Sequence, residues 1–249
     1  MPNSRERFSS RVDAYVKARP RYPRDVIEHL KRAIGLDPSW TIADIGSGTG
    51  ISCALFLANG NTVIGVEPNA AMRSAAEQSL RGLAKFQSVE GSAEATTLAD
   101  ASIDLAVAAQ AFHWFDIASA RREFWRILRP RGYALLMWND RKLGGSPFLQ
   151  DYERLLLEFG TDYLKVRHNN VDEGAIGRFF GAGGFQSAGF EHEQRLDWEG
   201  LEARLLSSSY VPQDNPKMIQ RLREIFDRHN GNGIVRIIYN TTLFYGHMT

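Results

Sequence analysis

The sequence predicts a doubly wound α/β fold with a mostly parallel sheet and helices on both of its faces. Short apolar runs alternate with amphipathic helical segments between residues 36 and 139, which is the pattern of βαβ units. The predicted strand at 102–112 contains a continuous apolar run, which is typical of a strand that is covered on both faces. A chain of 249 residues is long enough to bury one large core, so we expect a single domain over residues 1–249.

The predicted elements follow one another in a regular order. The polar start, residues 1–24, contains the prolines of "ARPRYPRD" and is expected to be extended or turning. The predicted helices of the first part are 25–34, 51–60, 69–82 and 116–132. The predicted strands are 40–46, 61–68, 84–91, 102–112 and 133–139. Gly35 is the expected stop of the first helix, Asn69 the expected cap of the third, and Pro130 and Gly132 the expected end of the fourth.

The alternation changes after residue 139. An amphipathic stretch at 146–164 predicts helix, so we expect a helical insertion above the sheet. A further strand at 183–197, a helix at 216–229 and a long last strand at 233–248, rich in β-branched and aromatic residues, complete the chain. The expected parts are an arm with its helix (1–35), a core (36–139), a helical insertion or lid (140–180), and C-terminal strands and helices (181–249).

Composition points to an ordinary globular protein, with 43% hydrophobic residues and a formal net charge of +1. This balance gives no reason to expect a nucleic-acid partner, and the basic residues of the N-terminal 32 are read as a solvated arm. The single cysteine, Cys53, excludes an internal disulfide and a cysteine-based metal cluster. We expect a cytoplasmic protein without metal or membrane span, because no secretory leader and no apolar stretch of about 20 residues is present.

The stretch "ADIGSGTG" at 43–50 places three glycines directly after a predicted strand, where a ligand approaches the backbone. A P-loop would need Lys and Ser or Thr after its last glycine, and Ile51 and Ser52 follow here. The dinucleotide fingerprint needs a small residue where this chain has Ile51. Both phosphate-binding interpretations are therefore disfavoured.

Two carboxylates flank this turn. Asp44 precedes the glycines, where it would repel a phosphate and attract an ammonium group. Glu67 ends the next predicted strand about 20 residues on, where an acid accepts the hydroxyls of a ribose. Acids at both places fit S-adenosylmethionine, a ligand with a ribose and a positive charge but no phosphate. The alternatives are a helix-capping role for Asp44 and a surface position for Glu67.

The order of motifs from Thr41 to Trp138 resembles the class I, seven-stranded S-adenosylmethionine-dependent methyltransferases. "ADIGSGTG" resembles the first motif of that family and "VIGVEPNAAM" the second. "VEGSAEATTLADASIDL", "AVAAQAFHWF" and "EFWRILRPRGYALLMW" resemble the later ones. The stretch "RPRYP" before the first helix is similar to the subgroup of trans-aconitate methyltransferase and other small-molecule methyltransferases. The resemblance implies a seven-stranded sheet with an antiparallel last strand.

The resemblance also implies where the amino-acid part of the cofactor lies. Asp44 would lie near the amino group, and Gln110 and Ala111 beside the sulfonium and the methionine tail. The backbone of the glycine turn would approach the methionine part; its members are Gly46, Ser47, Gly48 and Gly50.

The nucleoside part is expected on the other side of the turn. Glu67 would accept the ribose hydroxyls, Pro68 and Met72 would flank the adenine, and Ala93 and Glu94 would meet its edge. The alternatives are a core position for Met72 and a turn-capping role for Glu94.

The aromatic stretch "FHWF" follows the fourth predicted strand. Phe112 and Trp114 are expected at the substrate pocket, where the Trp114 ring would attract the sulfonium, or else in the core. His113 is the candidate proton acceptor, with a structural hydrogen-bonding role as the alternative. In the arm, Tyr15 and Arg19 are expected over the cofactor and Tyr22 at the substrate pocket; a solvent-facing charge run is the alternative.

The function expected from these features is methyl transfer to a small-molecule acceptor, in particular a carboxylate or another oxygen. A carboxylate is already ionised, and the chain has no obvious acid–base pair. The rival hypotheses are a non-catalytic S-adenosylmethionine-binding module and a nicotinamide-dependent oxidoreductase. The oligomeric state is left open between monomer and homodimer.

Overall fold

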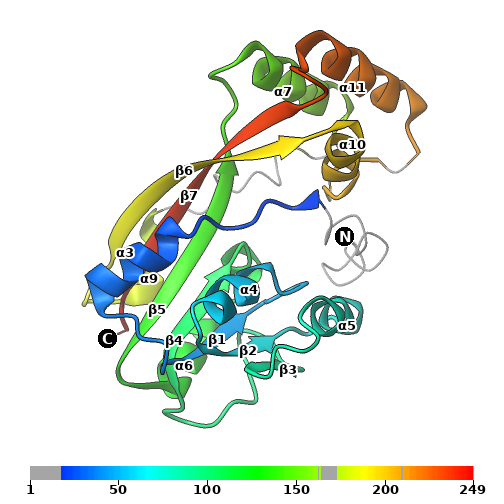
Figure 1. The fold of residues 1–249 in the computed structure, drawn as a ribbon. Helices are drawn as coiled ribbons and strands as arrows, with labels where there is room; N and C mark the ends of the chain where they lie inside the picture. Colours follow the sequence, from blue (N-terminus) through cyan, green and yellow to red (C-terminus); the bar gives the residue numbers. More distant parts are fainter. Residues whose placement is uncertain (1–17, 162, 164–172, 209, 213, 249) are drawn as a thin grey trace.

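The fold is a seven-stranded sheet in the order β3-β2-β1-β4-β5-β7-β6, seen in the computed structural model of Figure 1. The structure describes residues 18–161, 163, 173–208, 210–212 and 214–248. The strands are β1 (Thr41–Ile45), β2 (Thr62–Val66), β3 (Phe86–Val89), β4 (Ile103–Ala109), β5 (Leu128–Arg141), β6 (Gln186–Leu196) and β7 (Val235–His247). The pairings among β1 to β5 are parallel, and β7 runs antiparallel to both β5 and β6. The predicted fold class is confirmed, including the antiparallel last strand.

Helices cover both faces of this sheet. They are α3 (Asp25–Ile34), α4 (Ile51–Ala58), α5 (Ala70–Ser79), α6 (Ile117–Ile127), α7 (Pro147–Phe159), α9 (Glu173–Phe180), α10 (Trp198–Leu206) and α11 (Pro216–His229), with a short 3-10 turn η1 (Phe112–Trp114). Side chains of α3 and α4 form one apolar cluster with β1, β4 and β5, and those of α6 and α9 form another on the opposite face. The central strand β4 is therefore buried on both faces, which explains the apolar run at its carboxyl end.

Several helix ends follow their local sequence signals. Gly35 ends α3 in the left-handed conformation, with its N–H bonded to the Leu30 carbonyl. The Asn69 side chain accepts from the backbone N–H groups of Ala71 and Met72 and caps α5. Helix α6 ends at Ile127, earlier than predicted, because the residues before Pro130 are disfavoured in helical conformation and enter β5 instead.

The three long strands β5, β6 and β7 continue past the end of β4 and carry a second apolar core (Figure 1). Helices α7, α10 and α11 pack on this extension, which we call the upper lobe. The two described helices of the predicted 140–180 segment lie apart: α7 contacts α11 in the upper lobe, whereas α9 contacts α6 beside the sheet. Among the described residues, no helix combines the length and the apolar character that crossing a bilayer requires.

Candidate functional site

The glycine turn lies between the end of β1 and the start of α4, and its three glycines serve different purposes. All three have positive φ, at 72°, 54° and 84° for Gly46, Gly48 and Gly50. A Cβ on Gly46 would lie 2.6 Å from the Ala111 Cβ, and one on Gly50 would lie 2.8 Å from Leu80 Cδ1. A Cβ on Gly48 would meet no atom within 4 Å. Gly46 and Gly50 are thus needed for packing, while Gly48 leaves open space at the turn.

Glu67, directly after β2, is turned toward this glycine turn. Its carboxylate accepts the backbone N–H of Gly48 at 3.0 Å and that of Asn69 at 2.9 Å. Only 9% of the residue is exposed. The carboxylate therefore links the glycine turn to the cap of α5, at the level where the sequence predicts ribose binding.

Asp44, in β1, is fully buried beneath the turn. One carboxylate oxygen, Oδ2, accepts from Ser52 Oγ at 2.5 Å and from Cys53 Sγ at 3.1 Å, in the first turn of α4. The other oxygen, Oδ1, has no hydrogen-bond partner among the described residues. Burial raises the pKa of Asp44 to about 6, with a further contribution from the nearby Glu67. Oδ2 therefore fixes the start of α4, and Oδ1 remains as an acceptor for a cationic or hydrogen-donating ligand.

Gln110 marks the end of β4. It has a positive φ of 57°, which is uncommon outside glycine, and its backbone N–H donates to the Met137 carbonyl at 2.8 Å. Its side-chain N–H donates to the Asn139 carbonyl at 3.1 Å, and its Oε1 atom is buried without a partner among the described residues. The neighbouring Ala111 packs against Gly46. Strained backbone at a strand end beside a glycine turn is characteristic of binding sites.

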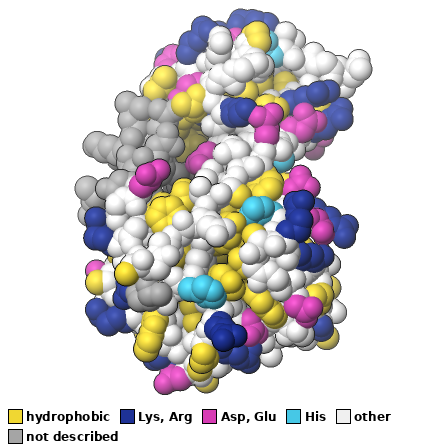
Figure 2. Space-filling model, turned by 90° about the vertical axis from the view of Figure 1, so that its left-hand side faces the viewer, with side chains coloured by type: hydrophobic (Ala, Val, Ile, Leu, Met, Phe, Trp, Pro, Cys, Tyr) yellow, Lys and Arg dark blue, Asp and Glu magenta, His cyan; other side chains and the backbone are white. Residues whose placement is uncertain are grey.

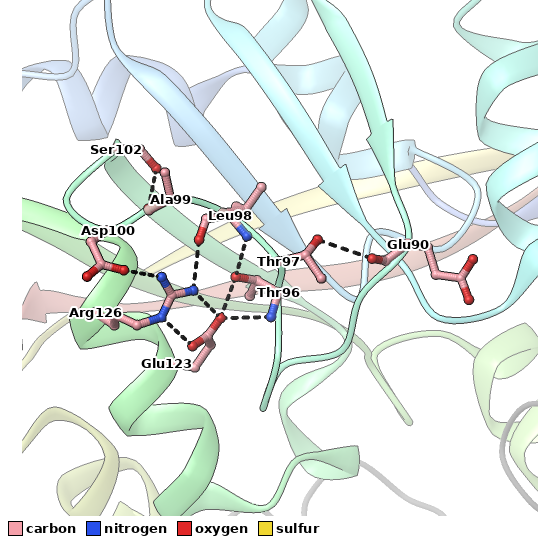
Figure 3. A network of polar contacts seen from close by, with 9 residues as sticks. All are labelled: Glu90, Thr96, Thr97, Leu98, Ala99, Asp100, Ser102, Glu123 and Arg126. Atoms are coloured by element: carbon pink, nitrogen blue, oxygen red, sulfur yellow. Dashed lines mark hydrogen bonds and ion pairs between the residues drawn. The ribbon is translucent and has the colours of Figure 1, made fainter.

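The loop after β3 is fixed to α6 by a polar network (Figure 3). Glu123 accepts from the backbone and the hydroxyl of Thr96, and Arg126 binds Glu123, Asp100 and the Leu98 carbonyl. The Arg126 guanidinium beside Glu123 lowers the pKa of that carboxyl to about 2. The network therefore stays ionised at neutral pH and holds the loop that carries the predicted adenine contacts.

Those predicted adenine contacts lie around the same loop and the start of α5. Ala93 and Met72 are buried, and Pro68 is partly exposed beside Glu67. The Glu94 carboxylate accepts the backbone N–H of Asp116 at 3.0 Å, so it joins the loop to the start of α6. Ser47 is buried in the glycine turn, and its hydroxyl packs over Gly65 of β2.

The three aromatic residues of η1 have different surroundings. Phe112 is in the core, with edge-to-face contacts to Trp138 and Phe179. Trp114 is 46% exposed. His113 lies between them in the sequence. Burial lowers the pKa of its imidazole to about 4, so the ring is neutral at pH 7. The same burial makes the imidazole a weak base, because a general base works best with a pKa near the working pH, so the structural alternative is favoured.

Residues 18–24, directly before α3, are the described part of the N-terminal arm. Tyr15 lies outside the described residues. The Arg19 guanidinium donates to the Ser207 carbonyl at 2.9 Å, at the end of α10. Tyr22 packs against the apolar cluster of α3 and α4. The described part of the arm thus runs from α10 in the upper lobe to α3 (Figure 1).

Sequence reasoning missed two polar residues of this edge. Thr49, inside the glycine turn, is buried, and its hydroxyl has no partner among the described residues. Asn139 accepts from Thr241 Oγ1 at 2.6 Å and receives the side-chain N–H of Gln110 on its carbonyl. The sequence signal that could have identified Asn139 is its place as a polar residue directly after the apolar run of the fifth strand.

The donor set at this edge fits S-adenosylmethionine. Asp44 Oδ1 is a buried acceptor suited to an ammonium group, Glu67 is a carboxylate where the sequence predicts the ribose, and Gly48 keeps the turn open. No lysine or arginine takes part in the described hydrogen bonds of the turn itself, so a pyrophosphate would meet two carboxylates instead of a cation.

Comparisons with known proteins agree with this geometry. Residues 43–136 match the methyltransferase domain family. An uncharacterized methyltransferase of Schizosaccharomyces pombe, C25B8.09, is 31% identical over 153 residues; the match covers 60% of this chain and 58% of that protein.

Two solved structures extend the likeness to the whole fold. A type II methyltransferase by its description, from Anaeromyxobacter dehalogenans, has a TM-score of 0.62 at 21% identity, covering 92% of this chain and 98% of that one. Geranyl diphosphate methyltransferase in complex with S-adenosylmethionine has a TM-score of 0.52 at 15% identity, covering 91% of this chain and 85% of that one. The matched residues 43–136 contain the glycine turn, Glu67 and the end of β4, so this part of the chain is similar to the methyltransferase domain family, and the strand order is that of the two methyltransferase structures.

Proposed function

We propose that this protein transfers the methyl group of S-adenosylmethionine to an oxygen of a small-molecule acceptor, in particular a carboxylate. The observation that carries the proposal is the open glycine turn at Gly48, with the Glu67 carboxylate on one side and the unpartnered Asp44 oxygen on the other. Both carboxylates are fixed by hydrogen bonds to the protein, so the site is organised before a ligand arrives.

When bound, S-adenosylmethionine supplies a methyl group already activated by a cationic sulfur. The residues of the chain bind and orient the reactants and exclude water. Glu67 would hold the ribose, Asp44 the amino end, and Gln110 the edge of β4 beside the reacting atoms. His113, with a pKa of about 4, would be a weak proton acceptor for a hydroxyl group, whereas a carboxylate acceptor has no proton to give.

A small organic acceptor is favoured over a nucleic acid. On the face seen in Figure 2, lysine and arginine side chains are interspersed with aspartate and glutamate, without the one-sided basic patch that phosphate backbones require. The "RPRYP" arm supports the narrower likeness to the trans-aconitate methyltransferase subgroup, also as a proposal. A cytoplasmic location is proposed from the single, buried cysteine, and a monomer or homodimer as the assembly.

The test is turnover. The purified chain is incubated with S-adenosylmethionine and a mixed pool of small metabolites, and formation of S-adenosylhomocysteine is followed over time. Acceptor-dependent turnover supports the proposal, whereas tight binding without turnover indicates a binding module. A side-by-side calorimetric titration with NADP decides the remaining rival, because tight binding of NADP alone would overturn the assignment.

A further inference from the structure

The side-chain amide of Gln110, at the end of β4, has different surroundings at its two ends. Its Nε2 donates to the main-chain carbonyl of Asn139 at 3.1 Å. Its Oε1 is buried and has no hydrogen-bond partner among the residues that the structure describes. A rotation of the amide that exchanged the two atoms would bring Oε1 against the Asn139 carbonyl, where two acceptors repel each other. The amide therefore has one favourable orientation, in which Oε1 remains as an acceptor for a ligand.

The main chain on both sides of this amide is fixed by further hydrogen bonds. The backbone N–H of Gln110 donates to the Met137 carbonyl at 2.8 Å. The Asn139 side chain accepts from Thr241 Oγ1 at 2.6 Å and donates to the Arg21 carbonyl at 3.3 Å, and only 6% of this residue is exposed. The position of Oε1 is thus set before a ligand arrives, as recognition by a preorganised group requires.

Gln110 lies at the same edge of the sheet as the glycine turn and Asp44. The next residue, Ala111, packs against Gly46 of the turn. Asp44 of β1 pairs with Val107 of β4, so Gln110 lies one strand across and three residues further along. With about 4.8 Å between strands and about 3.3 Å per residue, the α-carbons of Asp44 and Gln110 are about 11 Å apart. A cofactor held at Asp44 by its ammonium group would therefore extend its sulfur toward Gln110.

The Oε1 atom needs a hydrogen-bond donor, and S-adenosylmethionine has few of them. The proposed site assigns the ammonium group to Asp44 and the ribose hydroxyls to Glu67, and the adenine amino group is expected at the loop after β3. The remaining donor is the methyl group, whose C–H bonds are polarised by the positive sulfur and form weak hydrogen bonds to oxygen. S-adenosylhomocysteine lacks both this methyl group and the positive charge.

We propose that Gln110 Oε1 contacts the sulfonium methyl group and thereby distinguishes the charged cofactor from its neutral product. This inference rests on the proposed methyltransferase function and adds to it the residue that recognises the charge state of the cofactor. The contact is lost once the methyl group has been transferred, so Gln110 retains the unreacted cofactor and not the product. A purely structural Gln110 would affect the binding of both compounds equally.

The test is calorimetric titration of the purified chain with S-adenosylmethionine and, separately, with S-adenosylhomocysteine. The quantity compared is the Kd of S-adenosylhomocysteine divided by the Kd of S-adenosylmethionine. Gln110→Met, which keeps the length of the side chain and removes Oε1, should lower this ratio by about threefold to tenfold. Gln110→Glu, which turns a full negative charge toward the sulfur, should raise it by at least about threefold. Gln186→Met is the matched control and should keep the wild-type ratio, because Gln186 Oε1 already accepts from the Tyr245 hydroxyl at 3.0 Å.

A ratio within about twofold of wild type in both Gln110 variants would overturn the inference, as would a lowered ratio in Gln110→Glu. If Gln110→Met does not fold, the comparison of wild type with Gln110→Glu decides. The titrations of the wild-type protein separate this inference from the proposed function. Binding of both compounds, with a ratio that the Gln110 variants leave unchanged, refutes only the role of Gln110, whereas absence of binding of either compound refutes the proposed function.

Discussion

Replacing Glu67 tests the cofactor site most directly. The Glu67 carboxylate accepts backbone N–H groups from Gly48 and Asn69, so it holds the glycine turn and the start of α5 as well as the position predicted for the ribose. A hydrogen bond to a charged group contributes about 1.5–3 kcal/mol, and a buried polar group left without a partner costs about 1–3 kcal/mol. We therefore expect Glu67→Ala to weaken S-adenosylhomocysteine binding by about 1–3 kcal/mol, or about 5- to 150-fold in Kd.

Glu67→Gln separates the two contributions. The amide keeps one oxygen acceptor and turns an NH2 group toward a backbone N–H, so its effect should lie between those of wild type and Glu67→Ala. Glu28→Gln is the control: Glu28 is a carboxylate of α3 whose side chain is 48% exposed, and it pairs with Lys31 of the same helix. Its change should alter binding by less than about 0.5 kcal/mol.

The measurement is isothermal titration with S-adenosylhomocysteine, together with a thermal melt of each variant. A Kd of Glu67→Ala within about twofold of wild type would refute the ribose assignment. A lowered melting temperature with unchanged Kd would leave Glu67 with the structural role alone.

The remaining predictions concern the turn, its buried acid and η1. Gly46→Ala should lower the melting temperature more than Gly48→Ala, because its Cβ would meet Ala111 at 2.6 Å, whereas Gly48→Ala should mainly weaken binding of S-adenosylhomocysteine in a titration. Burial raises the folded-state pKa of Asp44 to about 6, so the folded protein binds a proton that the unfolded chain has already released between about pH 4 and pH 6. The free energy of unfolding of the wild type should therefore fall by an amount on the order of 2–3 kcal/mol as the pH rises through this range. Denaturation of Asp44→Asn at a series of pH values should lack this slope. Binding of S-adenosylmethionine should strengthen as pH rises through 6, because the ionised acid attracts its ammonium group; a Kd independent of pH would contradict that contact. Because an imidazole with a pKa of about 4 is a weak base, His113→Gln should leave kcat on a carboxylate acceptor and the Kd of S-adenosylhomocysteine close to wild type, and a loss of about 10²–10⁴-fold in kcat on a hydroxyl acceptor would instead assign His113 the role of proton acceptor.

Local signals predicted most of the fold. The cap at Asn69, the stop at Gly35 and the helix 216–229 depend on neighbouring residues alone, and each lies where the sequence predicts it. Helix α10 was missed because it is short, contains Gly200 and follows β6 directly, although Asp197 at its start was a capping signal. Short helices of this kind are stabilised mainly by tertiary packing, which a local pattern does not contain.

The residues of the candidate site fall into the same two groups, those that local sequence signals predict and those that only tertiary contacts bring together. The glycine turn and its two acids were predicted because a strand–turn–helix unit and the adjacent strand place them within about 25 residues of one another. Asn139 meets Thr241, and Arg204 meets Tyr239, only after the long strands pair across the sheet. No spacing rule connects residues so far apart in the chain, so the contacts of the upper lobe had to come from the structure.

Three unsatisfied polar atoms around the glycine turn connect stability to function. Asp44 Oδ1, Thr49 Oγ1 and Gln110 Oε1 come from β1, the turn and the end of β4, and each is buried without a partner in the described part of the chain. More than about 90% of buried polar groups in folded proteins are satisfied, so three exceptions at one edge are a concentrated cost of about 1–3 kcal/mol each. A ligand that satisfies them recovers this free energy only on binding. Cofactor binding should therefore raise the melting temperature of the protein by satisfying these atoms, which thermal melts with and without S-adenosylhomocysteine would check.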